Sequence, residues 1–263
     1  MSMIVDVAAF APHPDDVELF CGGTLITLAD KGYKTAVIDC TEGELATSGT
    51  PETRAVEAAN ASAEMGLVHR ENLKIPDGKI NPLSGADELD SSKDTQLHRA
   101  VSAIRRLQPK IVMIPHQEGR HPDHSAASTL IERAVFFAGL KQFKTDDGVE
   151  RHVPTQLLYY FMRFCGKPSF VVDTSSAHQR KVSAISAYKS QITPPKNGAG
   201  SETLINSPRT ISTIDARDQF YGAMIGVEYG EPFVIKNCLA ISDPVGHFNQ
   251  NSTAKALLFP GAL

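Results

Sequence analysis

The sequence predicts an α/β fold in which a mostly parallel central sheet lies between two layers of helices. Short apolar runs alternate with longer helical runs through the first half of the chain, which is typical of successive strand and helix units. The first run, residues 3–11, is apolar except for Asp6, as expected for a strand buried on both faces of a parallel sheet. These observations favour a Rossmann-like three-layer sandwich.

The expected elements follow one another without a linker or an internal repeat. Residues 51–65 are a clear helix, because Thr50 can cap it, Pro51 suits its first turn and Gly66 suits its end. Residues 190–209 are rich in Pro, Gly, Ser and Asn and predict a long loop. We expect one domain over residues 1–263. Its predicted strands are 3–10, 33–40, 111–115, 156–162 and 169–173, and its predicted helices are 17–31, 51–65, 94–107, 175–188 and 210–226.

Composition excludes several classes of protein. The chain has 263 residues and a net charge of −4, with Lys and Arg scattered, so we expect no nucleic-acid partner and no anionic membrane partner. No apolar run reaches the roughly 18 residues that span a bilayer, and the first ten residues lack the basic start of a secretory signal. A cytoplasmic location is therefore expected. The four cysteines lie far apart, which argues against a thiolate zinc site.

Ionisable side chains follow two of the predicted strands. The run "HPDD" places His13, Asp15 and Asp16 after the first strand, and "HQEGRHPDH" follows the strand at 111–115. Ligands of open α/β sheets bind at the carboxyl ends of the strands, so the two clusters face each other if these strands are neighbours. The first turn lacks the glycine fingerprint of a dinucleotide site, which disfavours a nucleotide or redox enzyme.

The residue types in these clusters suit a metal. Imidazole and carboxylate together favour Zn²⁺, and three protein ligands with one water make an open catalytic site. His121 and His124, like His13 and Asp16, are three residues apart and project to one side of a helix start. Two alternatives stay open: a pair of solvated charged loops, and helix-capping roles for Asp15 and Asp123.

The pairing of His-Pro-Asp-Asp with a later His-Pro-Asp-His resembles the PIG-L/LmbE-like zinc-dependent deacetylases that act on N-acetylglucosamine conjugates. The resemblance extends over nearly the whole chain, and its longer segments look most like the branch of bacillithiol biosynthesis that deacetylates N-acetylglucosaminyl malate. The segments that carry it are "HPDDVELFCGGTL", "TEGELATSGTPETRAVEAANASAEMG", "IPDG", "GRHPDHSAAS", "KPSFVVDTS", "AYKSQ" and "ARDQFYGAMIGVEYGEPF".

The resemblance implies roles for the two clusters. It makes His13, Asp16 and His124 the ligands of one Zn²⁺ per subunit, with Fe²⁺, Mn²⁺ or Co²⁺ as possible substitutes. It makes Asp15 the general base that takes a proton from the metal-bound water. His121 would stabilise the oxyanion or protonate the leaving amine, and Asp123 would orient or charge that imidazole.

The resemblance also suggests substrate-binding residues. Arg54 would bind substrate, since a guanidinium can hold the carboxylates of malate, and Glu42 or Glu44 would contact the sugar or order their loop. Relatives have a His-Arg-Pro whose arginine reaches a neighbouring subunit, and Arg151 in "ERHVPTQ" is its displaced candidate. The tyrosine that relatives use as an oxyanion donor has no clear match; Tyr188 and Arg209 are the candidates.

The sequence therefore favours a zinc-dependent hydrolase that converts N-acetyl-D-glucosaminyl L-malate to glucosaminyl malate and acetate. The first alternative is a deacetylase of another small N-acetylglucosamine conjugate or of a chitooligosaccharide. The second is a catalytically inactive, metal-dependent sugar-binding protein. By resemblance, the expected assembly is a homo-oligomer such as a hexamer.

Overall fold

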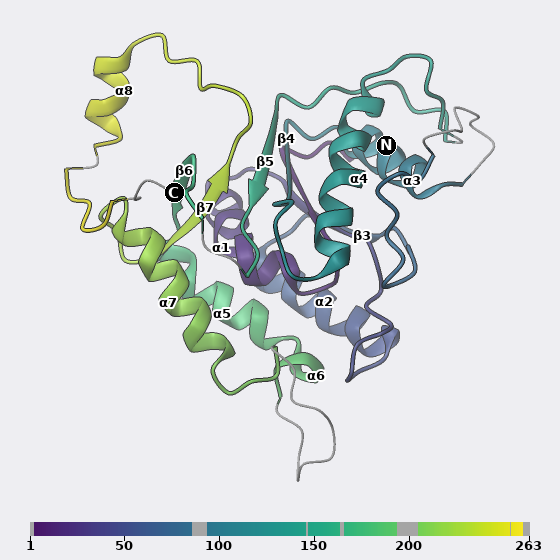
Figure 1. Ribbon diagram of the computed structural model, residues 1–263, viewed down its shortest axis with the longest axis horizontal. Coiled ribbons are helices and arrows are strands. Elements are labelled where there is room, and N and C mark those ends of the chain that lie inside the picture. Colours follow the sequence, from purple (N-terminus) through teal and green to yellow (C-terminus); the bar gives the residue numbers. More distant parts are fainter. Residues whose placement is uncertain are drawn as a thin grey trace.

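A computed structural model describes residues 3–85, 94–145, 147–163, 166–193, 205–252 and 254–259 (Figure 1). Its seven strands form one sheet in the order β3-β2-β1-β4-β5-β7-β6, with β7 antiparallel to both neighbours and the other pairs parallel. The strands are β1 (Val7–Ala11), β2 (Thr35–Asp39), β3 (His69–Asn72), β4 (Ile111–Pro115), β5 (Gln156–Tyr160), β6 (Phe170–Asp173) and β7 (Gly230–Val234).

Helices cover both faces of the sheet (Figure 1). Helices α1, α2 and α5 pack together on one face, and α3 packs with α4 on the other. The helices are α1 (Asp16–Asp30), α2 (Pro51–Met65), α3 (Gln96–Leu107), α4 (Pro122–Ala138), α5 (His178–Ser186), α6 (Lys189–Ile192), α7 (Thr210–Ala223) and α8 (Pro244–Gln250), with a short 3₁₀ turn at Ser175–Ala177. The predicted three-layer α/β fold is confirmed.

The central strand β1 contributes to both layers of the core. Its alternate residues Val7, Ala9 and Ala11 pack against the α1 side, whereas Ala8 and Phe10 pack against the α3 and α4 side. Period-two alternation in an apolar strand lets both faces bury side chains. All five residues of β1 are buried, which explains why the sequence shows a continuous apolar run.

Most predicted elements are present, and the differences have physical causes. Helix α2 begins and ends as predicted, with the Thr50 side chain accepting the Thr53 N–H and Gly66 at a φ of 69°. Strand β3 was not predicted, because its sequence "HREN" has no apolar run; it is held by β2 and by an ion pair between Arg70 and Asp39. The predicted loop at 190–209 contains the end of α6, and its residues 194–204 lie outside the described residues.

Helix α1 is interrupted at Cys21, whose φ of −144° is not helical. The interruption leaves the next amide groups without helical acceptors, and the Glu231 carboxylate of β7 accepts the N–H groups of Gly23 and Thr24 at 2.9 and 2.7 Å. The buried ammonium of Lys181 lies 2.7 Å from the same carboxylate and also contacts Asp218. A buried ion cluster therefore joins α1, α5, α7 and β7.

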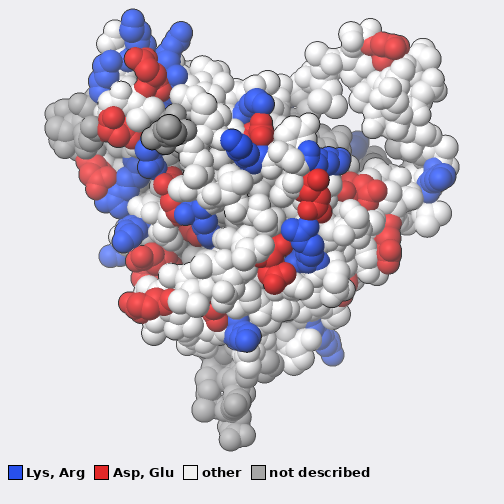
Figure 2. All heavy atoms as spheres, turned by 180° about the vertical axis from the view of Figure 1, so that it is seen from behind, with Lys and Arg blue, Asp and Glu red and all other residues white. Residues whose placement is uncertain are grey.

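The surface carries mixed charge and one projecting arm. Figure 2 shows acidic and basic side chains intermixed on the face turned away from the viewer of Figure 1. Helix α8 stands on an arm away from the sheet in Figure 1, and none of its residues is buried. Among the described residues, no helix combines the length and apolar character that a bilayer crossing requires.

Replacing Glu231 with alanine is expected to lower the free energy of unfolding by about 3–5 kcal/mol, because the change leaves Lys181 buried without this carboxylate and uncovers two amide groups. Urea unfolding followed by circular dichroism measures the loss. Glu132→Ala is the control, because Glu132 pairs with Lys236 at the surface, where such a pair contributes about 0–1 kcal/mol. Equal losses in the two variants would contradict the structural role of the cluster.

Candidate functional site

The two polar clusters meet because β1 and β4 are parallel neighbours. Val7 pairs with Ile111 and Ala9 with Met113, so both strands end at the same edge of the sheet. The segment after β1 leads into α1, and the segment after β4 leads into α4. The sequence-predicted residues of both turns are therefore brought together at the carboxyl edge of the sheet.

Asp16, one of the three predicted metal ligands, contacts the other two, His13 and His124, through its carboxylate. Asp16 Oδ2 lies 3.2 Å from His13 Nδ1 and 3.4 Å from His124 Nε2, and it also accepts the His13 N–H at 3.0 Å. Both Asp16 and His124 are buried, and His13 is half-buried. Although burial raises the pKa of Asp16, His124 and His13 outweigh it and hold that pKa well below its usual value. The carboxylate is charged and faces two imidazoles.

Two separations within this donor set match those around a tetrahedral cation such as Zn²⁺. Bonds of about 2.0–2.2 Å require neighbouring ligand atoms about 3.3–3.5 Å apart, close to the two separations around Asp16. Among the described residues, the groups whose ligand atoms all lie within 4.8 Å of one another are His13 with His121 and His124, and His13 with Asp77 and Asp123; the full set of His13, Asp16 and His124 is not one of them. In addition, the far nitrogen of His13, Nε2, lies 3.1 Å from Asp77, the arrangement that commonly orients a ligating imidazole.

Asp15 has an unusual backbone and a buried carboxyl group. Its φ is 112°, and its side chain caps no helix amide although it occupies the N-cap position of α1. Burial raises the pKa of Asp15 to about 7, despite the opposing charge of Arg54, whose Nη2 lies 3.0 Å from the Asp15 carboxylate. A pKa near neutrality suits a general base. The capping alternative for Asp15 is thus not realised.

His121 and Asp123 lie at the start of α4, and their contacts differ from the predicted ones. His121 is the N-cap, and its Nδ1 accepts the backbone N–H of Asp123 at 3.3 Å. The neutral imidazole therefore carries its proton on Nε2, which can donate. The Asp123 carboxylate lies 3.4 Å from His13 Nε2 and accepts the Gly78 N–H at 2.8 Å. It thus contacts a predicted metal ligand, not the His121 imidazole that it was expected to orient.

Asp77 belongs to the site and was missed from the sequence. Its Oδ1 lies 3.1 Å from His13 Nε2, and its Oδ2 accepts the Leu45 N–H at 3.1 Å. Burial acts to raise the pKa of Asp77, but His13 and the backbone N–H groups around it lower that pKa to about 2. The turn "IPDG" was the available signal, but it follows β3, a strand without an apolar run.

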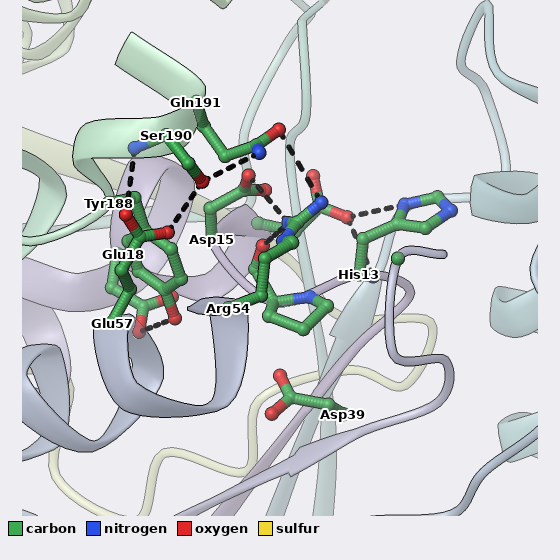
Figure 3. A network of polar contacts seen from close by, with 12 residues as sticks. His13, Asp15, Glu18, Asp39, Arg54, Glu57, Tyr188, Ser190 and Gln191 are labelled. Carbon is green, nitrogen blue, oxygen red and sulfur yellow. Dashed lines mark hydrogen bonds and ion pairs between the residues drawn. The ribbon is translucent and has the colours of Figure 1, made fainter. Parts of the chain in front are cut away.

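Arg54 and Glu42 both line a cavity of about 230 Å³ beside the turn after β1. The Arg54 side chain is only 4% exposed, and its guanidinium points at Asp15, as Figure 3 shows. The guanidinium also donates to the Pro14 carbonyl oxygen. Glu44 accepts the Asp77 N–H at 2.7 Å, so it orders its loop. Arg54, the arginine predicted to bind substrate, therefore forms an ion pair with Asp15, the predicted general base.

Two further candidates for substrate contact, Tyr188 and Arg151, lie outside this site. Tyr188 is fully buried and donates its hydroxyl to Glu18 at 3.0 Å; Figure 3 shows this pair across Arg54 from His13. Its expected role as an oxyanion donor is therefore wrong for this structure. Arg151 is exposed just before β5, which runs parallel to β4, so it lies at the opposite edge of the sheet. Arg151 cannot serve the site of its own chain.

Comparisons with known proteins find relatives that are deacetylases. The model of the family described as GlcNAc-PI de-N-acetylase, PIG-L, matches residues 8–135. Diacetylchitobiose deacetylase of Thermococcus kodakarensis is 31% identical over 233 residues, which cover 86% of this chain and 80% of the relative. A probable N-acetyl-alpha-D-glucosaminyl L-malate deacetylase 2 of Bacillus cereus is 24% identical over 191 residues, covering 68% and 80%.

A solved structure shares both the fold and a substantial part of the sequence. The conserved protein TT1542 of Thermus thermophilus superposes with a TM-score of 0.78 at 35% identity. The similarity covers 91% of this chain and 98% of that protein. The whole layered architecture, and not the sheet edge alone, is therefore common to the two chains.

We expect His124→Ala to lose at least about tenfold in Zn²⁺ affinity, because it removes one of the imidazoles that face Asp16. Atomic emission of the dialysed protein and titration with a zinc indicator measure occupancy and affinity. His116→Ala is the control: His116 comes from the same loop, but its ring packs on Phe161 at 5.3 Å. Unchanged zinc affinity in the His124 variant would contradict the ligand assignment.

Proposed function

We propose a reaction for this chain, which belongs to the GlcNAc-PI de-N-acetylase (PIG-L) family: hydrolysis of the acetamide of a small N-acetylglucosamine conjugate to a free amine and acetate. Because the family and its relatives are deacetylases, this chain is a deacetylase as well. The observation that carries the proposed reaction is the meeting of His13, Asp16 and His124 with a buried Asp15 at one sheet edge.

In this proposal His13, Asp16 and His124 hold Zn²⁺. When bound, such an ion lowers the pKa of its water to about 7 and polarises the acetamide carbonyl. Asp77 and Asp123 face the second nitrogen of His13 and fix the orientation of its ring. The same donor set can bind Fe²⁺, Mn²⁺ or Co²⁺, so the residues define a site and not a single metal.

The remaining steps belong to Asp15 and His121. The Asp15 carboxylate accepts a proton from the attacking water, a role that its pKa of about 7 suits at neutral pH. His121 is exposed and carries its proton on Nε2, so it can donate a hydrogen bond to the carbonyl oxygen. The proton that Asp15 has accepted from the water then passes to the leaving nitrogen. Departure of the amine and release of acetate complete the hydrolysis.

For the substrate, we propose first N-acetyl-D-glucosaminyl L-malate, as favoured by the segments that resemble the bacillithiol branch and by the relative from Bacillus cereus. Diacetylchitobiose is the second candidate, supported by the relative from Thermococcus kodakarensis. The buried position of Arg54 removes it as a ready anchor for malate carboxylates. We also propose a homo-oligomer such as a hexamer, in which Arg151 of one copy lies toward the site of another.

Acetate release tests the proposal directly. Purified protein, chelated and then restored with Zn²⁺, is given the malate glycoside, diacetylchitobiose and free N-acetylglucosamine in parallel. Zinc-dependent release that favours the malate glycoside supports the first substrate, and preference for diacetylchitobiose supports the second. Binding of these sugars by the zinc-loaded protein without any release would contradict the reaction and support a sugar-binding protein.

Asp15→Asn is expected to lower kcat by about 10²–10⁴-fold, because the amide keeps the shape of the side chain but cannot accept the proton. Zinc content should stay at the wild-type level, since Asp15 is not among the proposed ligands. Steady-state acetate release and metal analysis of the same preparation measure both quantities. A variant that retains more than about a tenth of the wild-type kcat would rule out Asp15 as the general base.

A further inference from the structure

We infer that Gln191 is a positioning residue, which holds the Arg54 guanidinium against Asp15 and thereby fixes the carboxylate of the proposed base. Gln191 belongs to the segment "AYKSQ", to which the proposed reaction assigns no role. The inference rests on the proposed function, since it concerns the residue assigned as general base. Figure 3 shows the residues that carry it.

Arg54 is held at several points of its guanidinium. Nη2 donates to Asp15 Oδ2 at 3.0 Å and to the Pro14 carbonyl oxygen, so one nitrogen contacts both the base and the residue before it. Gly43 adopts a φ of 67°, and a Cβ there would lie 2.5 Å from Arg54 Nη1. The glycine thus lets the guanidinium lie directly on the loop after β2.

Gln191 accepts from the other end of the guanidinium. Arg54 Nη1 donates to Gln191 Oε1 at 3.4 Å, while Gln191 Nε2 donates to the Ser48 carbonyl at 2.6 Å and to Ser190 Oγ at 3.0 Å. Reversing the carboxamide would set donor against donor at Arg54 and acceptor against acceptor at Ser48. The contacts of Nε2 therefore fix the direction in which Oε1 points.

Glu57 holds the turn that carries Gln191. Its two carboxylate oxygens accept the backbone N–H and the hydroxyl of Ser190, both at 2.7 Å. Helix α6 has only four residues and has little stability of its own. Glu57 and Arg54 both belong to α2. Helix α6 therefore contacts α2 twice, through Ser190 at Glu57 and through Gln191 at Arg54.

This geometry gives Gln191 a role that acts through Arg54. Arginine has a long side chain with many rotamers, and a fixed acceptor at Nη1 selects the one that places Nη2 on Asp15. Removing that acceptor leaves the guanidinium free to turn within the 230 Å³ cavity that Arg54 also lines. Turnover should then fall, whereas zinc and substrate binding should not.

The kinetic test uses Gln191→Ala, with Gln179→Ala on the exposed side of α5 as the matched control. We expect Gln191→Ala to lower kcat about tenfold, with KM and zinc content within about twofold of wild type. Gln179→Ala should leave kcat, KM and zinc content unchanged. In an Arg54→Lys background, Gln191→Ala should cause no further loss. Additive losses, a change confined to KM, or a loss of zinc would overturn the inference.

A second measurement needs no turnover. Nitrogen-15 spectra should resolve the Nη protons of Arg54, assigned by their absence in Arg54→Lys, because several acceptors hinder rotation of the guanidinium. These signals should merge or broaden in Gln191→Ala and persist in Gln179→Ala. Unchanged Arg54 signals in Gln191→Ala would overturn the inference. A wild-type protein that releases no acetate would instead defeat the proposed function, and the spectra would still decide the role of Gln191.

Discussion

The parallel pairing of β1 with β4 is the constraint on which the site depends. Each strand ends in a turn of histidine and aspartate, and neither turn alone offers both imidazoles that Asp16 contacts. Because the pair is in the middle of the sheet and buried on both sides, its register cannot slip without exposing apolar residues. The packing of the core therefore sets the separations among the polar groups.

Buried carboxylates around this strand pair are each held by a contact with an imidazole or a guanidinium. Asp77 and Asp123 lie behind His13, and Arg54 lies behind Asp15. Farther from the turn, Arg70 joins Glu18 to Asp39 within the protein. Buried charges of this kind cost desolvation, which opposite partners at hydrogen-bond distance offset. The site is thus supported by interactions that do not themselves touch a substrate.

The sequence predicts the fold and the central polar groups well, because both depend on local patterns. Apolar runs mark β1 and β4, and the residues directly after them are necessarily at the sheet edge. The partner of Arg54 could not be predicted, because Asp15 lies 39 residues away and a guanidinium can reach substrate or base equally. Tyr188 was misassigned for the same reason: only the fold shows that Glu18, 170 residues distant, accepts its hydroxyl.

The carboxylate that completes α1 is supplied very late in the chain. Glu231 lies 207 residues after Thr24, whose amide it accepts. At roughly 5–20 residues per second, a ribosome needs about 10–40 s to make the chain between them. During this time the Gly23 and Thr24 amides at the interruption of α1 lack the Glu231 carboxylate that accepts them in the folded protein. Assembly of the first helix is therefore tied to β7, and α1 cannot reach its final form before Glu231 has been made.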